Sequence, residues 1–302
     1  VTSMKKIRVA IAGASGYAGA ELVRLAALHP HFDLCAVTSE KSAGVPVASV
    51  FPSLAGLVPL SFQALSPESL AEMADAVFLA LPHTKSLTPV AACIQTGKLV
   101  VDLSADYRLK DPALYEQWYK TPHTHAGLLK DAVYGLPELH RNAIPKARLV
   151  ASPGCYPTAA VLQLAPLFAQ SLVDSQGHIV IDAKSGVSGA GRSPALPYHF
   201  PEAHESIEAY KVGQHRHTPE IEQELAGLLR RVSQPSETDA AQPIVTFTPH
   251  LVPMNRGILS TAYCRLKRPT TLSELRDLYR TFYKGERFVR VQDDIMPNPR
   301  YI

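Results

Sequence analysis

One segment of the sequence carries a residue that could attack a carbonyl carbon. Ser152-Pro-Gly-Cys155-Tyr-Pro-Thr158 follows an apolar run and precedes a helical pattern, so Cys155 is expected at a helix N-terminus. There the backbone amides favour the thiolate, which is the nucleophilic form of cysteine. The alternative is a small buried thiol, and this interpretation suits Cys35, Cys93 and Cys264 among their apolar neighbours. Because glycine and proline flank Cys155, we predict that it is a nucleophile.

A proton partner for that thiolate is offered by the segment His215-Arg-His217. A neutral imidazole accepts and returns a proton near pH 7. Two alternatives are open: an ordinary surface pair, or a metal site, for which His123 and His125 form a second pair. Because the sequence places no third ligand beside either pair, no metal site is predicted.

A cluster of glycines lies where the first apolar strand pattern gives way to a helical pattern. At such a junction, glycines permit a tight turn and a close approach to a pyrophosphate, which the free amides of the helix attract. The spacing is GxxGxxG and not GxGxxG, so the triplet alone is weak evidence, and a packing turn is the alternative. The context favours dinucleotide binding by Gly13, Ser15, Gly16, Tyr17, Ala18 and Gly19.

The segment after the second apolar run bears on the choice of cofactor. A carboxylate there usually binds the ribose 2′-hydroxyl of NAD, whereas a 2′-phosphate needs a cation and hydroxyl donors. Ser39, Lys41 and Ser42 supply such groups, so we predict NADP(H). Glu40 argues the other way, and a solvated loop is the alternative.

These segments need a fold to position them, and the first half of the chain predicts one. Short, nearly continuous apolar runs occur at residues 6–12, 34–37, 76–81, 99–103 and 149–151. Such runs are typical of parallel strands that helices cover on both faces. We therefore predict a Rossmann-like, NADP-binding domain over residues 1–151.

The second half of the chain has a different texture. Strand candidates lie at residues 179–183, 244–247 and 258–266, with an amphipathic helix at 273–283 and a polar loop at 234–242. Separated strands without helical repeats indicate an antiparallel α+β domain over residues 152–302. The fold class predicted for the whole chain is α/β, with this α+β catalytic domain following the Rossmann-like one.

Composition excludes several classes of function. With 46% hydrophobic and 19% charged residues the chain is globular, and a net charge of +3 without runs of like charge argues against nucleic-acid or lipid partners. No apolar stretch reaches the roughly 18 residues of a membrane helix. Four widely spaced cysteines predict reduced thiols and a cytoplasmic protein.

Eight segments, in their order and spacing, resemble the N-acetyl-gamma-glutamyl-phosphate reductase family and, more distantly, the aspartate-semialdehyde dehydrogenases. They are GASGYAGAELVRL from Gly13, FLALPHTKS from Phe78, VDLSADYRL from Val101, YGLPEL from Tyr134, SPGCYPTAA from Ser152, SGVSGAGR from Ser185, HRHTPEIEQ from His215 and TPHLVPMNRGI from Thr248. The resemblance implies an NADP-dependent enzyme of arginine biosynthesis, which reduces N-acetyl-L-glutamyl 5-phosphate through a thioester on Cys155. It also implies a homodimer or homotetramer formed through the second domain.

The resemblance implies roles for further residues. The family's acid/base histidine corresponds to His215 in the first place and to His217 otherwise. Cofactor contacts are also expected from Pro82, Ser185 and Gly186. A dianionic leaving group needs fixed cations and hydroxyls, and the candidates for substrate binding are Arg108, Ser188, Arg192 and Arg256. Each arginine could instead form a structural salt bridge, and Asp102 and Asp106 are expected to orient neighbours or cap turns.

Two alternatives to this function are open. The same residues could reduce another acyl phosphate, of the aspartyl or aminoadipyl type. The chain could also be a nucleotide-binding redox regulator without turnover. Members of the family normally continue beyond the equivalent of Ile302 with a segment that returns to the dinucleotide domain, and we expect that segment to be missing here.

Overall fold

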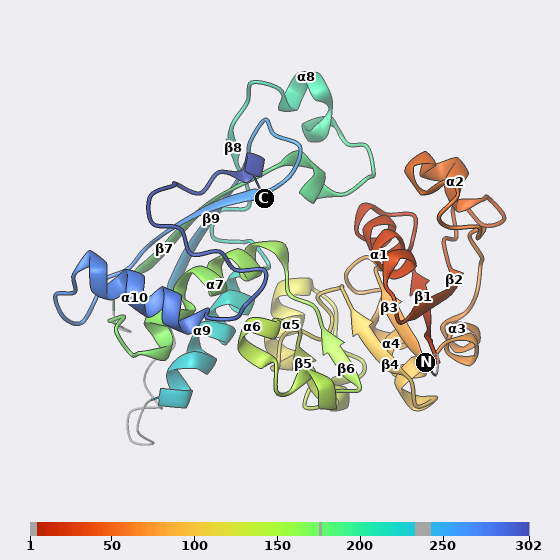
Figure 1. Ribbon diagram of the computed structural model, residues 1–302, viewed down its shortest axis with the longest axis horizontal. Helices are drawn as coiled ribbons and strands as arrows, with labels where there is room; N and C mark the ends of the chain where they lie inside the picture. Colours follow the sequence, from red (N-terminus) through yellow and green to blue (C-terminus); the bar gives the residue numbers. More distant parts are fainter. Residues whose placement is uncertain (1–4, 175–176, 233–242, 302) are drawn as a thin grey trace. The chain divides into compact units, whose positions relative to one another are not determined.

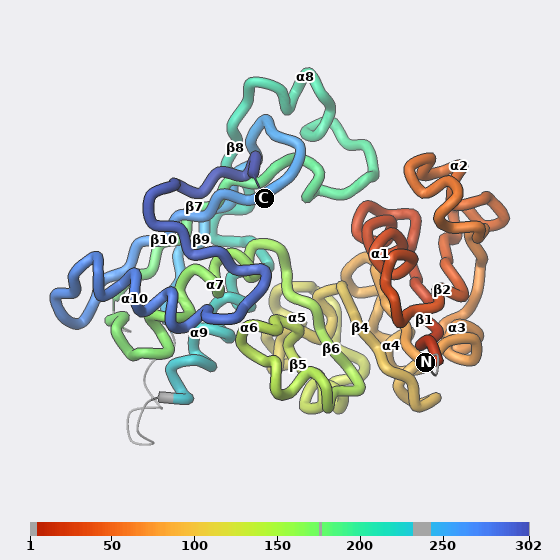
Figure 2. The backbone as a smooth tube through the Cα atoms, viewed as in Figure 1, coloured from red at the N-terminus to blue at the C-terminus, as the bar shows by residue number. Residues whose placement is uncertain are grey.

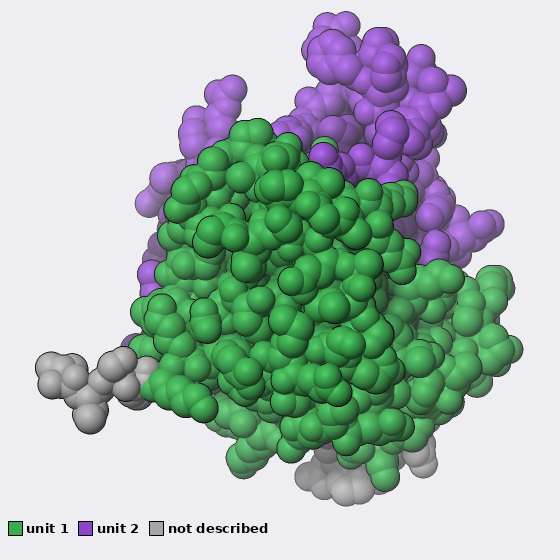
Figure 3. All heavy atoms as spheres, turned by 90° about the vertical axis from the view of Figure 1, so that its right-hand side faces the viewer, with its two compact units in different colours: residues 1–153 green, residues 154–302 purple. Residues whose placement is uncertain are grey.

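The computed structural model describes residues 5–174, 177–232 and 243–301, and the loop expected at 234–242 lies outside them. The chain forms two compact units, Val1–Pro153 and Gly154–Ile302. Figure 3 colours them separately, and the path of the backbone can be followed in Figure 2. Within the described ranges, no helix is long and apolar enough to cross a membrane.

The first unit contains a parallel six-stranded sheet in the order β2-β1-β3-β4-β6-β5 (Figure 1). Its strands are β1 (Ile7–Ala12), β2 (Phe32–Val37), β3 (Ala76–Leu79), β4 (Leu99–Asp102), β5 (Ala132–Tyr134) and β6 (Leu149–Ala151). Its helices are α1 (Tyr17–Leu28), α2 (Val47–Val50), α3 (Pro67–Met73), α4 (Leu87–Gln95), α5 (Pro112–Tyr119) and α6 (Pro137–His140). Every apolar run predicted for this half forms a strand. The strand β5, at the edge of the sheet, was not predicted.

Both faces of this sheet are buried, as β1 illustrates. Val9 and Ile11 pack in one apolar cluster with Val23 of α1, whereas Ala10 and Ala12 pack in a second cluster with residues of α3 and α4. Successive side chains of a strand point to opposite faces. A strand covered on both sides therefore needs a continuous apolar run, which is the pattern that predicted it.

The order of the strands reverses at β1, which lies between β2 and β3. The turns after β1 and β3 meet at the carboxyl ends of these strands. The amide of Ala80 donates to the carbonyl of Ala12 at 2.8 Å, and Gly13 lies against the carbonyl of Ala80. In open α/β sheets, ligands bind at such a reversal.

The second unit contains a mixed four-stranded sheet in the order β10-β7-β9-β8. Its strands are β7 (Ile179–Ser185), β8 (Glu208–Ala209), β9 (Val245–Leu251) and β10 (Ile258–Tyr263), and its helices are α7 (Cys155–Ala169), α8 (Phe200–Ala203), α9 (Thr218–Val232) and α10 (Leu272–Phe282). Helices α7 and α9 pack against each other, and in addition α7 packs against β10 and α9 against β9.

The predicted fold class, a Rossmann-like domain followed by an α+β domain, is confirmed. The expectation that the second sheet is antiparallel is wrong for one pair, because β7 and β9 run parallel. Parallel strands need a long crossover connection. The segment with α9 supplies it, and no crossover was predicted between these two strands.

Gly19→Ala is expected to destabilise the first unit by about 1–3 kcal/mol. A Cβ at Gly19 would lie 2.4 Å from the carbonyl oxygen of Gly13 and 2.6 Å from Cα of Ala14, so the backbone of the turn has to shift. Gly16→Ala is the matched control, because there the nearest atom would lie 3.8 Å away. Urea unfolding measures both variants, and equal losses in the free energy of unfolding would contradict this prediction.

Candidate active site

Cys155 is the first residue of α7, and it is exposed. Gly154 precedes it as the N-cap, with an extended backbone (φ −66°, ψ 155°). The amides of a first helical turn lack partners within the helix, and the helix dipole adds positive potential. Negative charge on the sulfur is therefore favoured at this position.

The other three cysteines are in a different environment. Cys93 is buried, and Cys35 and Cys264 are half-buried. Burial raises the pKa of the Cys93 thiol to about 11, and it also raises the pKa of Cys35 and Cys264. These three side chains therefore stay protonated and fit the small buried thiols that the sequence analysis expected.

A buried carboxylate connects the beginning of α7 with the beginning of α9. The amide of Gly154 donates to Oε1 of Glu220 at 2.8 Å, and Glu220 is 1% exposed. The sequence analysis gave Glu220 no role. An acidic residue in the first turn of a helix is common, and only the packing of α7 on α9 shows that its carboxylate faces Gly154.

His217 lies on the backbone next to Cys155. A Cβ at Gly154 would be 2.5 Å from Nε2 of His217 and 2.9 Å from its Cδ2 and Cε1. The imidazole therefore packs on the α-carbon of Gly154, where only glycine leaves room for it. His217 is half-buried, and this position brings a titratable ring to the residue before the sulfur.

His215 lies deeper, inside a group of aromatic rings. The ring centres of Tyr156, Tyr210 and Phe247 are 5.2–5.7 Å from that of His215. Its Nδ1 accepts the backbone N–H of His217 at 3.1 Å, so the proton of the neutral ring lies on Nε2. Burial, followed by the charges of His217 and other neighbours, lowers the pKa of His215 to about 3. A ring with this pKa stays neutral at physiological pH and is a weak base.

Two segments that hydrogen-bond to each other carry the predicted substrate and cofactor residues of the second unit. One segment begins at the end of β7 and carries Ser185, Gly186, Ser188 and Arg192, and the other follows β9 and carries Arg256. The amide of Gly186 donates to the carbonyl of Gly257 at 3.0 Å, and that of Ser188 to the carbonyl of Asn255 at 3.1 Å. Gly186 needs its missing side chain, because a Cβ there would be 2.8 Å from the amide nitrogen of Arg256. Arg192 and Arg256 are both exposed. Ser185 is buried, and its hydroxyl donates to the carbonyl of Gly186 at 3.0 Å.

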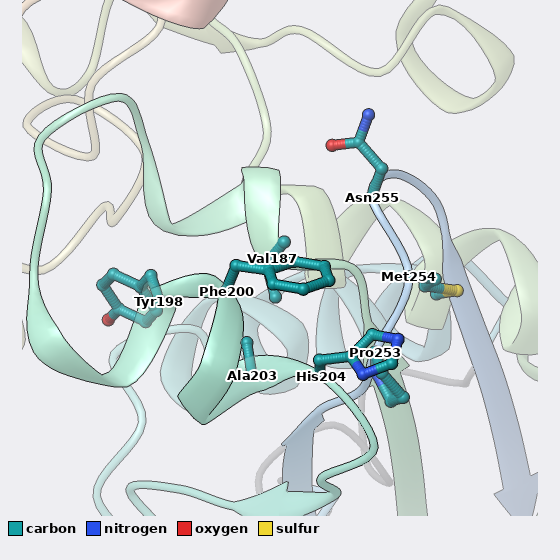
Figure 4. A pocket seen from close by; sticks show the side chains of 8 residues that line it. All are labelled: Val187, Tyr198, Phe200, Ala203, His204, Pro253, Met254 and Asn255. Carbon is teal, nitrogen blue, oxygen red and sulfur yellow. The ribbon is translucent and has the colours of Figure 1, made fainter.

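An apolar pocket of about 320 Å³ lies beside these two segments (Figure 4). Its polar lining comes from Tyr198, His204 and Asn255. The remaining lining residues are Val187, Phe200, Ala203, Pro253 and Met254. The pocket thus shares its wall with the loop that carries Ser188.

In the first unit, the predicted glycine turn has the geometry of a phosphate-binding turn. Gly13 has a positive φ of 76°, which permits the tight turn between β1 and α1. Gly19 packs against the backbone of Gly13, whereas a Cβ at Gly16, the N-cap of α1, would meet only the carbonyl oxygen of Gly13, at 3.8 Å. A pyrophosphate could therefore approach the backbone and the free amides of α1 at Gly16.

The predicted residues after β2 lie next to that turn. The hydroxyls of Ser15 and Ser39 are 2.7 Å apart, and Ser39 is buried, so the ends of β1 and β2 are joined through side chains. Lys41 is exposed and Ser42 half-buried in the turn that follows. Tyr17, Ala18 and Pro82 are exposed.

Arg108 is placed differently from a ligand-binding cation. Its guanidinium is buried and donates to the carbonyls of Ser152 and Leu103 at 2.6 and 2.8 Å. These bonds fasten the backbone just after β6. In the described part of the chain, no three His, Cys, Asp or Glu side chains gather as metal ligands.

Two family models match the chain. The semialdehyde dehydrogenase NAD-binding domain matches residues 8–147, and the semialdehyde dehydrogenase dimerisation domain matches residues 155–302. Among proteins named N-acetyl-gamma-glutamyl-phosphate reductase, one from Heliobacterium modesticaldum is 51% identical over 95% of this chain and 80% of its own length. One from Dehalococcoides mccartyi is 50% identical over 99% of this chain and 82% of its own.

Solved structures share the fold at low identity. Aspartate semialdehyde dehydrogenase II from Vibrio cholerae, complexed with ASA, has a TM-score of 0.67 and 14% identity, over 98% of this chain and 84% of its own. Aspartate semialdehyde dehydrogenase with NADP from Candida albicans has a TM-score of 0.64 and 16% identity, over 93% and 76%. The resemblance that the eight sequence segments indicate is confirmed.

The burial of His215 predicts a loss of stability in acid. Its pKa is 6.5 in the unfolded chain and about 3 in the folded one, so below pH 6.5 the unfolded state binds the extra proton. The stabilisation is complete above pH 6.5 and declines as the pH falls, by roughly 3 kcal/mol between pH 7 and pH 4. In His215→Asn this part of the decline should vanish. Urea unfolding at each pH compares the two proteins, and parallel pH profiles would refute the assignment.

Proposed function

The chain belongs to the semialdehyde dehydrogenases and, within them, to the N-acetyl-gamma-glutamyl-phosphate reductases, and from this premise we propose its reaction. It reduces N-acetyl-L-glutamyl 5-phosphate to N-acetyl-L-glutamate 5-semialdehyde and phosphate, with NADPH, in arginine biosynthesis. One observation carries this proposal: the exposed Cys155 begins α7 with the imidazole of His217 packed on the residue before it. A nucleophile beside a titratable ring is what acyl transfer needs.

In the proposed reaction, the thiolate of Cys155 attacks the acyl carbon. A carbon–sulfur bond forms, the bond to the phosphate oxygen breaks, and a thioester stays on the enzyme. This intermediate accepts hydride more readily than a carboxylate does, which is the benefit of the covalent step. When bound, NADPH supplies that hydride. The resulting thiohemiacetal expels the sulfur as the aldehyde forms, and Cys155 is restored.

We assign to His217 the proton transfers at the oxygen of the thiohemiacetal, although the resemblance gave His215 as the first candidate for this role. His217 is half-buried and lies against Gly154, whereas His215 is buried among aromatic rings with a pKa near 3. The contribution of such a group is typically 10²–10⁴ in rate. Glu220 acts as a positioning residue, because its bond to the Gly154 amide fixes the backbone on which both Cys155 and His217 depend.

The first unit is suited to NADP(H). Gly16, which is not tightly packed, is the N-cap of α1, and the free amides of a helix N-terminus attract a pyrophosphate. Ser39, Lys41 and Ser42 follow β2, where a 2′-phosphate needs a cation and hydroxyls. Residues 1–151 are accordingly the proposed cofactor domain, with further contacts from Ser15, Tyr17, Ala18, Pro82, Ser185 and Gly186.

Residues 152–302 are the proposed catalytic domain, and they mediate assembly into a homodimer or homotetramer. Ser188 and the exposed Arg192 and Arg256 are the proposed anion ligands for the phosphate and the α-carboxylate of the substrate. Arg108 is left out of this set, because its guanidinium is committed to backbone carbonyls. The proposed location is the cytoplasm.

The function and its nucleophile are tested together with Cys155→Ser. The wild type should oxidise N-acetyl-L-glutamate 5-semialdehyde in the presence of phosphate, faster with NADP than with NAD, and faster than it oxidises aspartate or aminoadipate semialdehydes. Cys155→Ser should lower this rate by at least about 10³, because a serine hydroxyl, unlike a thiol, is almost never ionised at neutral pH and is the weaker nucleophile. NADP titration should be unchanged. A wild type that binds NADP without turnover would point to a regulator.

The choice of base is tested by comparing two substitutions two residues apart. His217→Asn should lower kcat by about 10²–10⁴ and leave the thermal midpoint of unfolding nearly unchanged. His215→Asn should lower the midpoint and reduce kcat by much less, because it disturbs the aromatic cluster. Steady-state kinetics and thermal melts measure both. The opposite ranking in kcat would return the role to His215.

A further inference from the structure

One buried carboxylate in the first unit, that of Asp106, has no role in the proposed reaction, and it binds the turn 82–86. Asp106 is 0% exposed. Its Oδ1 accepts the amide of Thr84 at 2.7 Å and the hydroxyl of Tyr115 at 3.0 Å, and its Oδ2 accepts the amide of Ser86 at 2.9 Å. One side chain therefore binds two amides of the turn 82–86, which connects β3 to α4.

This turn has a backbone conformation that needs outside support. Thr84 has a φ of +69°, which is unfavourable for a β-branched residue and costs about 1–3 kcal/mol. The bond from its amide to Asp106 compensates part of this cost. A second bond fastens the same turn, because the amide of Ala105 donates to Nδ1 of His83 at 3.0 Å.

Asp106 is itself fixed from two sides. Its carbonyl accepts Nε2–H of His123 at 2.7 Å, and its amide donates to Oγ of Ser104 at 3.1 Å. The ring of His123 makes edge contacts with Tyr107 and Tyr115, at 5.1 and 5.0 Å between ring centres. His123, for which a metal site or a surface pair was considered, thus supports the backbone of Asp106.

The turn 82–86 lies near the carboxyl ends of β1 and β3, where the dinucleotide is expected to bind. Residues 80–81 join β3 to this turn, and the carbonyl of Ala80 faces the α-carbon of Gly13 in the glycine turn. The two turns therefore flank the reversal of strand order at which ligands bind. Pro82 in this turn is exposed and available for contact.

We infer that Asp106 is a positioning residue for the cofactor: it holds the strained turn 82–86 in the conformation that NADP(H) contacts. This inference rests on the proposed function, in which the first unit binds that cofactor. Asparagine at this position offers one oxygen in place of two and turns an N–H₂ group toward an amide donor. A turn that is no longer held has to be ordered when the cofactor binds, and affinity falls accordingly.

The test is a titration of NADP onto the full chain, by intrinsic fluorescence, with Asp106→Asn. We expect the Kd for NADP to rise about tenfold, and the KM for NADP to rise with it while the KM for the semialdehyde stays constant. Tyr115→Phe is the matched control, because it removes one bond to the same carboxylate and leaves both turn amides bound. Its Kd should rise less than threefold.

The same substitution made in a Thr84→Gly variant separates the positioning of the turn by Asp106 from a general loss of stability. Glycine tolerates a positive φ, so in Thr84→Gly the turn depends less on Asp106, and adding Asp106→Asn there should weaken NADP binding by less than threefold. An equal loss in both backgrounds, or an equal loss in Tyr115→Phe, overturns the inference. So does a folded Asp106→Asn variant with the Kd of the wild type.

Two further results keep the test decisive. If Asp106→Asn does not fold, Thr84→Pro replaces it, because proline removes the amide donor and forbids a positive φ while the buried carboxylate stays in place. We expect the same tenfold rise in Kd, and an unchanged Kd overturns the inference. A wild type that itself fails to bind NADP contradicts the proposed function instead, which distinguishes the two failures.

Discussion

The second unit depends on one buried hydrogen bond, from the amide of Gly154 to the carboxylate of Glu220. The donor is the last residue before α7, and the acceptor lies in the first turn of α9. Residues that begin two packed helices are thereby held together, although they are more than 60 positions apart in the chain. Cys155 follows the donor in the chain and His217 packs on the donor's α-carbon, so this bond fixes the backbone beside both residues. The bond is also protected from water, which strengthens it.

The two histidines show how burial separates residues of the same type. Both belong to one short segment, and their ring centres are 4.7 Å apart. His215 is buried among aromatic rings that exclude water from it, whereas His217 packs on the backbone of Gly154 and is half-buried. Two residues of one short segment therefore differ in role: burial lowers the pKa of His215 and keeps that ring neutral within the packing, while His217 lies beside the backbone that carries Cys155.

Much of the fold was predictable from the sequence, because burial on both faces leaves a direct trace in composition. The strands of the first sheet are short apolar runs, and the glycine turn between β1 and α1 follows from the contacts of Gly13 and Gly19. Prediction failed for β5, an edge strand, and for the partner of β7. The parallel pairing of β7 with β9 depends on a connection more than 50 residues long, which no local pattern records.

The sequence alone determined which chemical groups are available: a cysteine before a helical pattern, a histidine pair, a glycine turn and hydroxyls with a lysine after the second strand. It determined these because local conformation depends on near neighbours. The tertiary structure decided how each group behaves. It buried His215, turned Glu220 toward Gly154 and committed Arg108 to backbone carbonyls. It also directed Asp106 to the turn after β3. These outcomes depend on desolvation and on contacts between distant segments, which no local pattern records.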